Sequence, residues 1–342
     1  MKTLLLVIIP FLFILHENSI AQNQSENPST DFPKVKGSYL GQKPPGSLAQ
    51  LFAPGIISTG LYTRDMAITP DGKEIYYCIS SLGYNLIFYS KQVNGSWTEP
   101  QPAPFIDNYE YMYYEPCISH DGEKLFFLSD MPENENGKQG NQDIWVVDKE
   151  GENWGKPYNL GEPISTKNAE FFPSVTKEGT IYFTRQLKGE RVNSIYRSKL
   201  VNGKYTEPER LPKQVNCGTN RFNAFVAPDE TYIIVPAAGM KDSYGGANYY
   251  IVFRNKDDSW SEPINMGEEI NKNLGRGWSP YISPDGKYFF FMSSKSVIKD
   301  KNSIKPSLKL FLEMHNQAGY GNSAIYWIDA KIIQDLKPKE IK

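Results

Sequence analysis

The segment Tyr281–Phe290, YISPDGKYFF, decides the fold of this chain. An Asp-Gly pair between two apolar runs is the strongest short-range signal for a β-hairpin, because these residues adopt the backbone conformations of a tight turn. The same pattern of apolar run, acidic turn and second apolar run recurs four more times. The copies are Ala67–Tyr77 (AITPDGKEIYY), Cys117–Phe127 (CISHDGEKLFF), Ser174–Phe183 (SVTKEGTIYF) and Phe225–Ile234 (FVAPDETYII).

The spacing of the copies predicts a propeller. Their acidic turn residues stand at positions 71, 121, 178, 229 and 285, so successive turns are 50, 57, 51 and 56 residues apart. A third apolar run follows each copy, and the first four copies add a polar turn and an aromatic-x-x-Pro segment. Proline suits an outer edge strand, where a missing N–H costs nothing. Four strands in each of five copies predict an all-β, five-bladed β-propeller of four-stranded antiparallel blades.

The fifth copy lacks the aromatic-x-x-Pro segment, but the start of the chain supplies a replacement. Leu51–Thr59 resembles Leu160–Thr166, which ends the second copy. We therefore predict that an N-terminal strand completes blade 5 and closes the ring, which leaves no blade edge free. The propeller should span residues 51–335, with blades starting near residues 62, 112, 169, 220 and 276 and a tail at residues 336–342.

The first residues have the pattern of a secretory signal peptide over residues 1–21. Lys2 precedes an apolar run, Leu4–Leu15, and Ser19–Ala21 fits the small-x-small rule for cleavage after Ala21. The run is shorter than the roughly 20 residues that a transmembrane helix needs. We expect a periplasmic or secreted protein, with a flexible leader at residues 22–50 that is rich in Asn, Ser, Pro and Gly.

The repeat resembles the WD-like propeller repeat of TolB and its periplasmic relatives. Ser283–Lys287, SPDGK, has the typical form of that repeat, and Ser129–Trp145 resembles the longer hairpin of the family. The resemblance covers about Leu51 to Ile328, and it implies work in protein complexes or in the cell envelope. Two features depart from the family pattern: Glu230 replaces the turn glycine, and an insertion interrupts the fifth copy near Ser294–Ala318.

Candidate site residues come from the innermost strands, which line the central channel of a propeller. The residues that open these strands are Thr63–Asp65, Tyr113–Glu115, Glu170–Phe172, Arg221–Asn223 and Arg276–Trp278. Two interpretations stay open: a polar pocket for a peptide terminus, carboxylate or sugar, or charges that pair with each other and plug the channel. The predicted ligand-binding residues are Arg64, Asp65, Tyr114, Glu115, Glu170, Arg221, Asn223, Arg276 and Trp278.

The leading functional hypothesis is a non-catalytic, exported binding or scaffold propeller for a protein, peptide or glycan at the channel face. The alternative is a carbohydrate-active hydrolase that uses Asp65, Glu115 and Glu170. Such chemistry requires two carboxyl groups about 5–10 Å apart, one of them with a raised pKa. A third hypothesis is a scaffold with a plugged channel that uses only its rim.

Composition excludes several other classes. The net charge of −2 and the absence of a basic block argue against nucleic acid and anionic membrane surfaces as main partners. No segment after the signal peptide has membrane-spanning length, so we expect no membrane insertion. The chain lacks glycine-rich phosphate loops and a Gly-x-Ser-x-Gly motif, so we expect no cofactor. Beyond the signal peptide only two histidines remain, so no metal site is predicted. The three cysteines are odd in number, so at least one thiol is unpaired, and a bridge between Cys78 and Cys117 stays open. We expect a monomer.

Overall fold

The computed structural model describes residues 32–132, 139–272, 275, 277–298 and 300–339. The predicted signal peptide, the first part of the predicted leader and the last residues of the tail lie outside these ranges. The description that follows concerns the compact unit Lys34–Lys342. No helix within the described ranges is long and apolar enough to cross a membrane.

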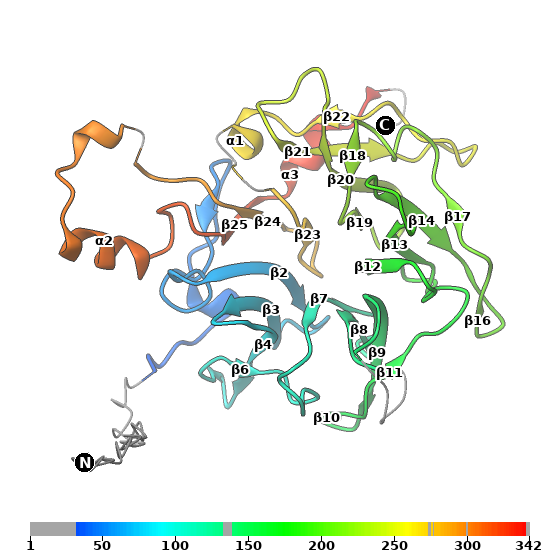
Figure 1. Cartoon of the computed structure of the whole chain (residues 1–342), viewed down its shortest axis with the longest axis horizontal. Coiled ribbons are helices and arrows are strands. Elements are labelled where there is room, and N and C mark those ends of the chain that lie inside the picture. The colour runs from blue at the N-terminus through cyan, green and yellow to red at the C-terminus, as the bar shows by residue number, and fades with distance from the viewer. Residues whose placement is uncertain (1–31, 133–138, 273–274, 276, 299, 340–342) are drawn as a thin grey trace, which may run out of the picture. The chain divides into compact units, whose positions relative to one another are not determined.

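Five antiparallel sheets follow one another along the chain as the blades of a ring (Figure 1), which confirms the predicted five-bladed β-propeller. Blade 1 contains β2 (Tyr62–Ile68), β3 (Glu74–Ser81), β4 (Tyr84–Val93), β5 (Ser96–Trp97) and β6 (Gln101–Pro102). Blade 2 contains β7 (Tyr113–Ile118), β8 (Lys124–Ser129), β9 (Asp143–Glu150), β10 (Asn153–Trp154) and β11 (Tyr158–Asn159). Blade 3 contains β12 (Ala169–Val175), β13 (Ile181–Gln186), β14 (Ser194–Ser198) and β17 (Glu209–Arg210), with a small hairpin of β15 (Leu200–Val201) and β16 (Lys204–Tyr205). Blade 4 contains β18 (Asn220–Arg221), β19 (Phe225–Val226), β20 (Tyr232–Ala238), β21 (Ala247–Phe253) and β22 (Ile264–Asn265). Blade 5 contains β23 (Tyr281–Ile282), β24 (Tyr288–Ser293), β25 (Ala324–Asp329) and β1 (Gln50–Leu51).

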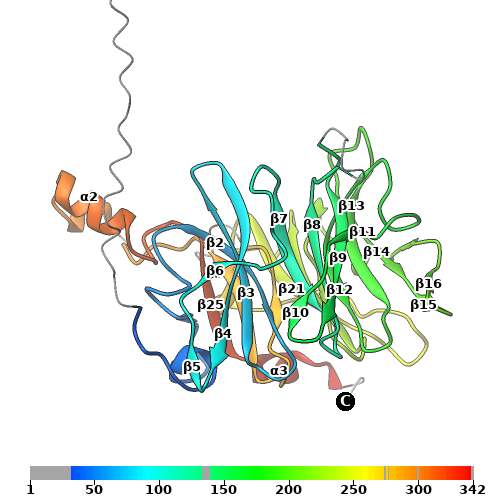
Figure 2. The ribbon, with the colours of Figure 1, turned by 90° about the horizontal axis from the view of Figure 1, so that it is seen from below.

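The two ends of the channel define two faces. We call the face where the inner strands begin the upper face, and the face where they end in the acidic turns the lower face. Figure 2 shows α2 and the turn between β3 and β4 on the upper side, and α3 on the lower side. The short helical elements are η1 (Tyr39–Gly41), α1 (Glu268–Asn271), η2 (Lys301–Ser303), α2 (Leu308–His315) and α3 (Lys331–Leu336).

An N-terminal strand closes the ring, as the sequence predicts. In β1, Gln50 pairs with Trp327 and Leu51 pairs with Tyr326 of β25. Immediately after β1, the Phe52 N–H donates to the Ile325 carbonyl at 2.9 Å. The outermost strand of blade 5 therefore comes from the opposite end of the chain from its other three strands, and the ladder joins the two ends.

Residues 34–49 belong to the predicted flexible leader, and they contact blades 1 and 5. The Trp97 N–H donates to the Val35 carbonyl at 2.8 Å, and the Trp97 indole N–H donates to the Gly37 carbonyl at 2.7 Å. Leu40 is buried, and the Tyr39 hydroxyl donates to Asp285 at 3.0 Å. The ordered chain therefore joins the ring ahead of β1.

Five apolar clusters hold the blades together, one at each interface between neighbouring blades. Among the described residues, four of these clusters contain 12 to 15 buried side chains, whereas the cluster between blades 2 and 3 contains seven. Apolar burial is the main favourable term in such interfaces. The contact between blades 2 and 3 is therefore the thinnest in the ring.

The aromatic-x-x-Pro segments also differ at this interface. In blades 1, 2 and 4 the aromatic residue is Trp97, Trp154 or Trp260, and each packs against the preceding blade. In blade 3 the equivalent residue is the smaller Tyr205, which packs on blade 2. A groove of about 910 Å³ lies at this interface and is lined in part by Tyr205. In blades 1 and 2 the aromatic residue lies in a short outer strand, β5 or β10, and the segment that follows, β6 or β11, pairs with the same third strand; in blades 3 and 4 only the segment after the proline, β17 or β22, joins the sheet.

The acidic turns of the lower face are held by their own side chains. In blade 1, Asp71 accepts hydrogen bonds from the Thr69 hydroxyl at 2.7 Å and from the Lys73 N–H at 3.0 Å. The same pattern recurs at Asp121 and Asp285. Blade 3 carries Glu178 instead, and the hydroxyl of Thr176 is buried without a hydrogen-bond partner. Aspartate therefore fits this turn because its short side chain accepts hydrogen bonds from groups within the turn.

Candidate binding site in the central channel

Each inner strand, or the segment that leads into it, carries one non-glycine residue in the left-handed backbone region. The five residues occupy equivalent positions in the five blades, with φ between 50° and 60°. Such a conformation costs roughly 1–3 kcal/mol for a residue with a Cβ, so it persists only where the surroundings hold it. The residues are Asp65, Glu115, Phe172, Asn223 and Ser279.

In blades 1 to 3 the left-handed residue belongs to a β-bulge. Arg64 pairs with Cys78 and Ala67 pairs with Tyr76, so two residues of β2 stand opposite one residue of β3. Equivalent register shifts interrupt β7 and β12. A proline directly follows Glu115, Phe172 and Ser279, which the bulge tolerates because the ladder needs no N–H there. The bulge turns one side chain of each blade out of the regular alternation.

A buried ion network occupies the channel at the level of the bulges. The Arg64 guanidinium donates through Nε to Asp65 at 3.0 Å and through Nη2 to Glu115 at 2.6 Å. Glu115 also accepts from the Asn223 side-chain amide at 3.1 Å. All four side chains are at least nine-tenths buried. We call this group, Arg64, Asp65, Glu115 and Asn223, the septum.

The septum also ties successive blades through their backbones. The Glu115 N–H donates to Asp65 at 3.2 Å, and the Phe172 N–H donates to Glu115 at 2.7 Å. The Ser279 hydroxyl of blade 5 donates to Asp65. Each carboxylate thus satisfies a backbone N–H of the next blade at its left-handed residue. A buried carboxylate that accepts several hydrogen bonds is held firmly in place.

Burial dominates the electrostatics of Glu115. Desolvation raises the pKa of this carboxyl from 4.5 to about 7, although the Arg64 charge favours ionisation and acts against the shift. The nearby charge of Asp65 adds to the rise. The septum thus sets one guanidinium against two carboxyl groups, so the positive charge of Arg64 is offset where it stands.

Two cavities lie on either side of the septum. Arg64 and Glu115 line an upper cavity of about 340 Å³, whereas Asp65 lines a lower one of similar volume. The paired charges therefore divide the channel. This arrangement resembles the predicted alternative in which charges pair and plug the channel, although a cavity remains at each end of it.

The upper cavity is an aromatic cup above the septum. Its wall contains Tyr114, Phe171, Phe222 and Trp278, one ring from each of blades 2 to 5, and all four are half-buried. The Phe222 and Trp278 rings meet edge to face with centroids 5.8 Å apart. The Arg64 guanidinium lies 5.1 Å from the Tyr114 ring and 5.5 Å from the Trp278 ring, so these two aromatics hold its plane. Three amide side chains complete the wall: Gln142, Asn193 and Asn220.

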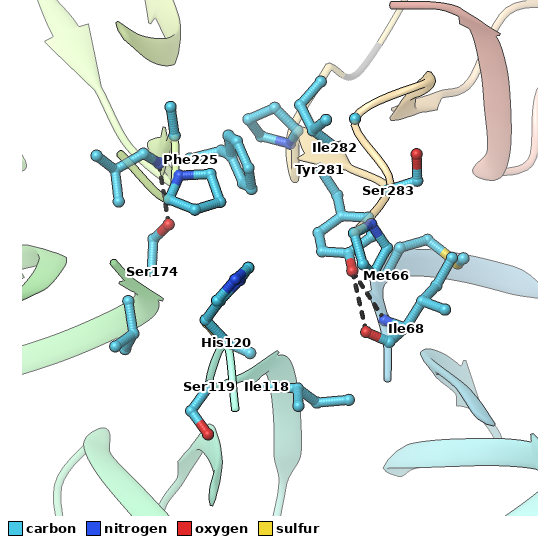
Figure 3. Close-up of a pocket in the computed structure, with 18 of the residues that line it drawn as sticks. Met66, Ile68, Ile118, Ser119, His120, Ser174, Phe225, Tyr281, Ile282 and Ser283 are labelled. Atoms are coloured by element: carbon cyan, nitrogen blue, oxygen red, sulfur yellow. Dashed lines mark hydrogen bonds between the residues drawn. The ribbon is translucent and has the colours of Figure 1, made fainter. Parts of the chain in front are cut away.

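The lower cavity is lined by the ends of the inner strands and by the acidic turns (Figure 3). The Tyr281 hydroxyl accepts from the Ile68 N–H at 3.0 Å, and the Ser174 hydroxyl accepts from the Val226 N–H at 2.9 Å. These bonds each join two blades. Figure 3 shows His120 extending toward the middle of the pocket. The rest of the wall mixes polar and apolar side chains. Among the polar ones, the Ser119 and Ser283 hydroxyls donate to the acidic residue of their own turn, Asp121 and Asp285.

The remaining predicted site residues lie elsewhere. Glu170 does not contact the septum; it is fully buried and accepts from Arg185 at 2.7 Å and from the Thr166 hydroxyl at 2.7 Å. Burial raises the pKa of Glu170 as well. Arg221 donates to three backbone carbonyls, those of Asn193, Cys217 and Gly218, and so supports its loop. Arg276 lies outside the described residues.

The structure adds several residues that the predicted set leaves out. Phe171 and Phe222 flank the left-handed residues and line the cup, and Ser279 completes the hydrogen bonding of Asp65. The x-Pro pairs at positions 115–116, 172–173 and 279–280 were a usable signal, because they mark the left-handed residue in three blades. Asn193 and Gln142 stand just before the third strands of their blades, β14 and β9, and carry no sequence signal. All three cysteines are free thiols, and the described part of the chain contains no cluster of His, Cys, Asp or Glu that could hold a metal ion.

Solved structures of known proteins include relatives in fold. TolB from Acinetobacter baumannii matches with a TM-score of 0.44 and 15% identity over 79% of this chain, which spans 57% of that protein. A protein assigned as TolB from Agrobacterium tumefaciens matches with a TM-score of 0.46 and 16% identity over 79% of this chain and 90% of its own. A puromycin-hydrolysing peptidase from Mycobacterium tuberculosis matches over 68% of this chain and 34% of its own, with a TM-score of 0.40 and 12% identity. No family model and no curated protein matches the sequence. Two of these structures are described as TolB, in line with the predicted resemblance, and the five-bladed propeller of this chain rests on its own sheets.

Proposed function

We propose that this protein is an exported, non-catalytic binding or scaffold propeller whose protein, peptide or glycan ligand enters the aromatic cup. The observation that carries the proposal is the cup itself, a concave site with four half-buried rings around a fixed guanidinium. Sites of this kind combine an apolar wall with a few placed polar groups, which is the usual composition of a binding pocket. The signal-like sequence at residues 1–21 supports a periplasmic or secreted location.

The surroundings of the cup favour a ligand larger than the cup. Loops and α2 on the upper face expose large apolar side chains, which is typical of a surface that contacts a macromolecule. Separate blades contribute them, so a polymer seated in the cup would meet them on several sides. These residues are Leu82, Tyr84, Tyr109, Val192, Tyr244, Leu308, Phe311 and Leu312.

One observation favours the alternative of a carbohydrate-active hydrolase: the pKa of Glu115 is raised to about 7, as in a general acid. Against it, Asp65 and Glu115 are committed to Arg64, Ser279, Asn223 and backbone N–H groups. The third carboxylate of the hypothesis, Glu170, is bound to Arg185 and Thr166. These carboxylates hold the ring together, and we therefore place the hydrolase second.

The test compares binding and turnover in the same preparations. The purified protein, Phe222→Ala and Glu115→Gln are screened against an array of glycans and against peptide libraries, and product release is measured in parallel. We expect binding that Phe222→Ala reduces at least about tenfold, with no turnover in any sample. Product release that Glu115→Gln abolishes would establish the hydrolase instead. Binding that Phe222→Ala leaves unchanged would move the site away from the cup.

A further inference from the structure

We infer that the ligand of the aromatic cup is a neutral, hydroxyl-rich sugar ring of a glycan. This inference rests on the proposed function, because it identifies the ligand class of the same cup. Three features of the cup support it: its charge, its hydrogen-bonding groups and the shape of its wall.

Charge argues against an ionic ligand. The cation of the septum, Arg64, already contacts two carboxyl groups, so an incoming carboxylate would meet a centre with little net positive charge. Arg221, the other arginine predicted for the site, is surrounded by backbone carbonyls. A cationic ligand fares no better, because Arg64 already contacts the Tyr114 and Trp278 rings and its own positive charge would repel a second cation in the cup. The cup therefore selects an uncharged group.

The hydrogen-bonding groups of the wall require a ligand that both donates and accepts. Nε and Nη2 of Arg64 bond to the septum carboxylates, and Nη1 has no hydrogen-bond partner among the described residues. Because Nε and Nη2 share one edge of the planar guanidinium, Nη1 points away from these acids, toward the cup that Arg64 lines. The amide side chains of Gln142, Asn193 and Asn220 also line the cup, and an amide carries both a donor and an acceptor. An alcohol can accept from a guanidinium or an amide N–H and donate to an amide oxygen, so neighbouring hydroxyls on a ring suit both kinds of group.

The apolar part of the wall fits the other face of a sugar. Phe171, Phe222 and the exposed edge of Trp278 surround the cup, and their π-faces are weakly negative. The axial C–H groups of a pyranose form a flat, weakly positive patch that packs on such faces, while its hydroxyls project sideways toward the amides of Gln142, Asn193 and Asn220. A volume of about 340 Å³ is at the lower end for small-molecule pockets and suits a single unit of a longer chain.

The experiment uses defined probes. Neutral oligosaccharides of glucose, xylose, mannose and N-acetylglucosamine, an anionic oligogalacturonate and a random peptide library are offered to the purified protein. Affinities are then measured by titration calorimetry. We expect one neutral series to bind, with a loss of at least about tenfold in Phe222→Ala and roughly three- to tenfold in Asn193→Leu.

Matched controls separate a local effect from a loss of fold. Tyr158→Ala removes an exposed aromatic ring from β11, at the outer edge of blade 2, and Asn153→Leu removes an exposed amide from β10; both should bind as the parent does. Asn193→Leu keeps the septum intact, so it reports on the cup even where larger truncations disturb folding.

The remaining outcomes distinguish the two levels of the proposal. If a peptide binds, loses affinity in Phe222→Ala, and no neutral oligosaccharide competes, the sugar inference fails while the binding function of the cup stands. Preferential binding of oligogalacturonate would likewise overturn the inference, since it would mean that the septum attracts anions. If nothing binds, or if bound probes ignore Phe222→Ala, both the inference and the proposed function fail.

Discussion

The acidic turns of the lower face and the left-handed residues of the channel each occupy the same place in all five blades, yet their side chains behave differently. All five turns carry Asp or Glu at the same position. The left-handed residues share one backbone conformation but are Asp, Glu, Phe, Asn and Ser. A turn residue bonds its own turn, so every blade requires the same chemistry. A left-handed residue faces other blades across the channel, so each one meets different neighbours and follows its own requirement. In this molecule, uniform backbone with divergent side chains marks the candidate site.

The largest difference between the two sets should appear when one cation is removed from each. Arg64→Met should cost about 3–5 kcal/mol of unfolding free energy at pH 7, because it leaves two buried carboxyl groups without their cation. Lys73→Met removes the exposed partner of Asp71 in the first turn and should cost less than about 1 kcal/mol. Urea unfolding of both variants measures the difference. Similar losses in the two variants would mean that the septum is no more than a surface ion pair.

Acidity should act on the two sets in opposite directions. The pKa of Glu115 is raised to about 7, so the folded protein binds its proton more tightly than the unfolded chain does. Stability from this group is therefore fully present below about pH 4.5 and is lost as the pH rises toward 7, by at most about 3 kcal/mol. The hydrogen bonds to Asp71, Asp121 and Asp285 lower the pKa of these carboxyls despite partial burial, so their contribution is present above their ordinary pKa and is lost as the pH falls below it.

Unfolding midpoints between pH 3 and pH 8 measure these slopes. In Glu115→Gln the decline between pH 4.5 and 7 should disappear, whereas in Asp121→Asn it should remain. A parent protein whose stability rises steadily through this window would contradict the assignment to Glu115.

The smallest expected effect concerns the difference between Glu and Asp among the turns. Glu178→Asp should stabilise the protein by about 0.5–1 kcal/mol, because the shorter carboxylate can reach the unpartnered hydroxyl of Thr176 as Asp121 reaches Ser119. The reverse change, Asp121→Glu, serves as the control and should destabilise by a similar amount. Thermal unfolding resolves both shifts. No gain in Glu178→Asp would show that backbone geometry, and not side-chain length, leaves Thr176 unpaired.

Local sequence was sufficient to predict the fold. An Asp-Gly turn forms through contacts among residues two to five apart, so the segment around Asp285 states its own structure. Ring closure was also predictable, because Leu51–Thr59 repeats the form of Leu160–Thr166. Both predictions depend on short segments that behave alike wherever they occur.

The candidate site was predictable only in part. Glu170 was expected in the channel because it belongs to the segment that opens the inner strand of blade 3. The left-handed conformation of Phe172 breaks the regular alternation of that strand, and Glu170 instead binds Arg185 within blade 3. Bulges are set by the register between two strands, which a single run of residues does not encode. The x-Pro pairs after Glu115, Phe172 and Ser279 were the nearest local trace of them.

Blade 3 has Tyr205 where blades 1, 2 and 4 have tryptophan, and this difference affects where the polypeptide can be divided. The ring is least continuous at two places. One is the thin interface between blades 2 and 3, and the other is the pairing of β1 with β25. Cutting the chain in the connection 161–168 would yield two fragments, one with β1 and blades 1 and 2, the other with the rest. The first would carry the outer strand that the second lacks. Such fragments should recognise each other through that missing strand, which makes this ring a natural scaffold for split-protein reassembly.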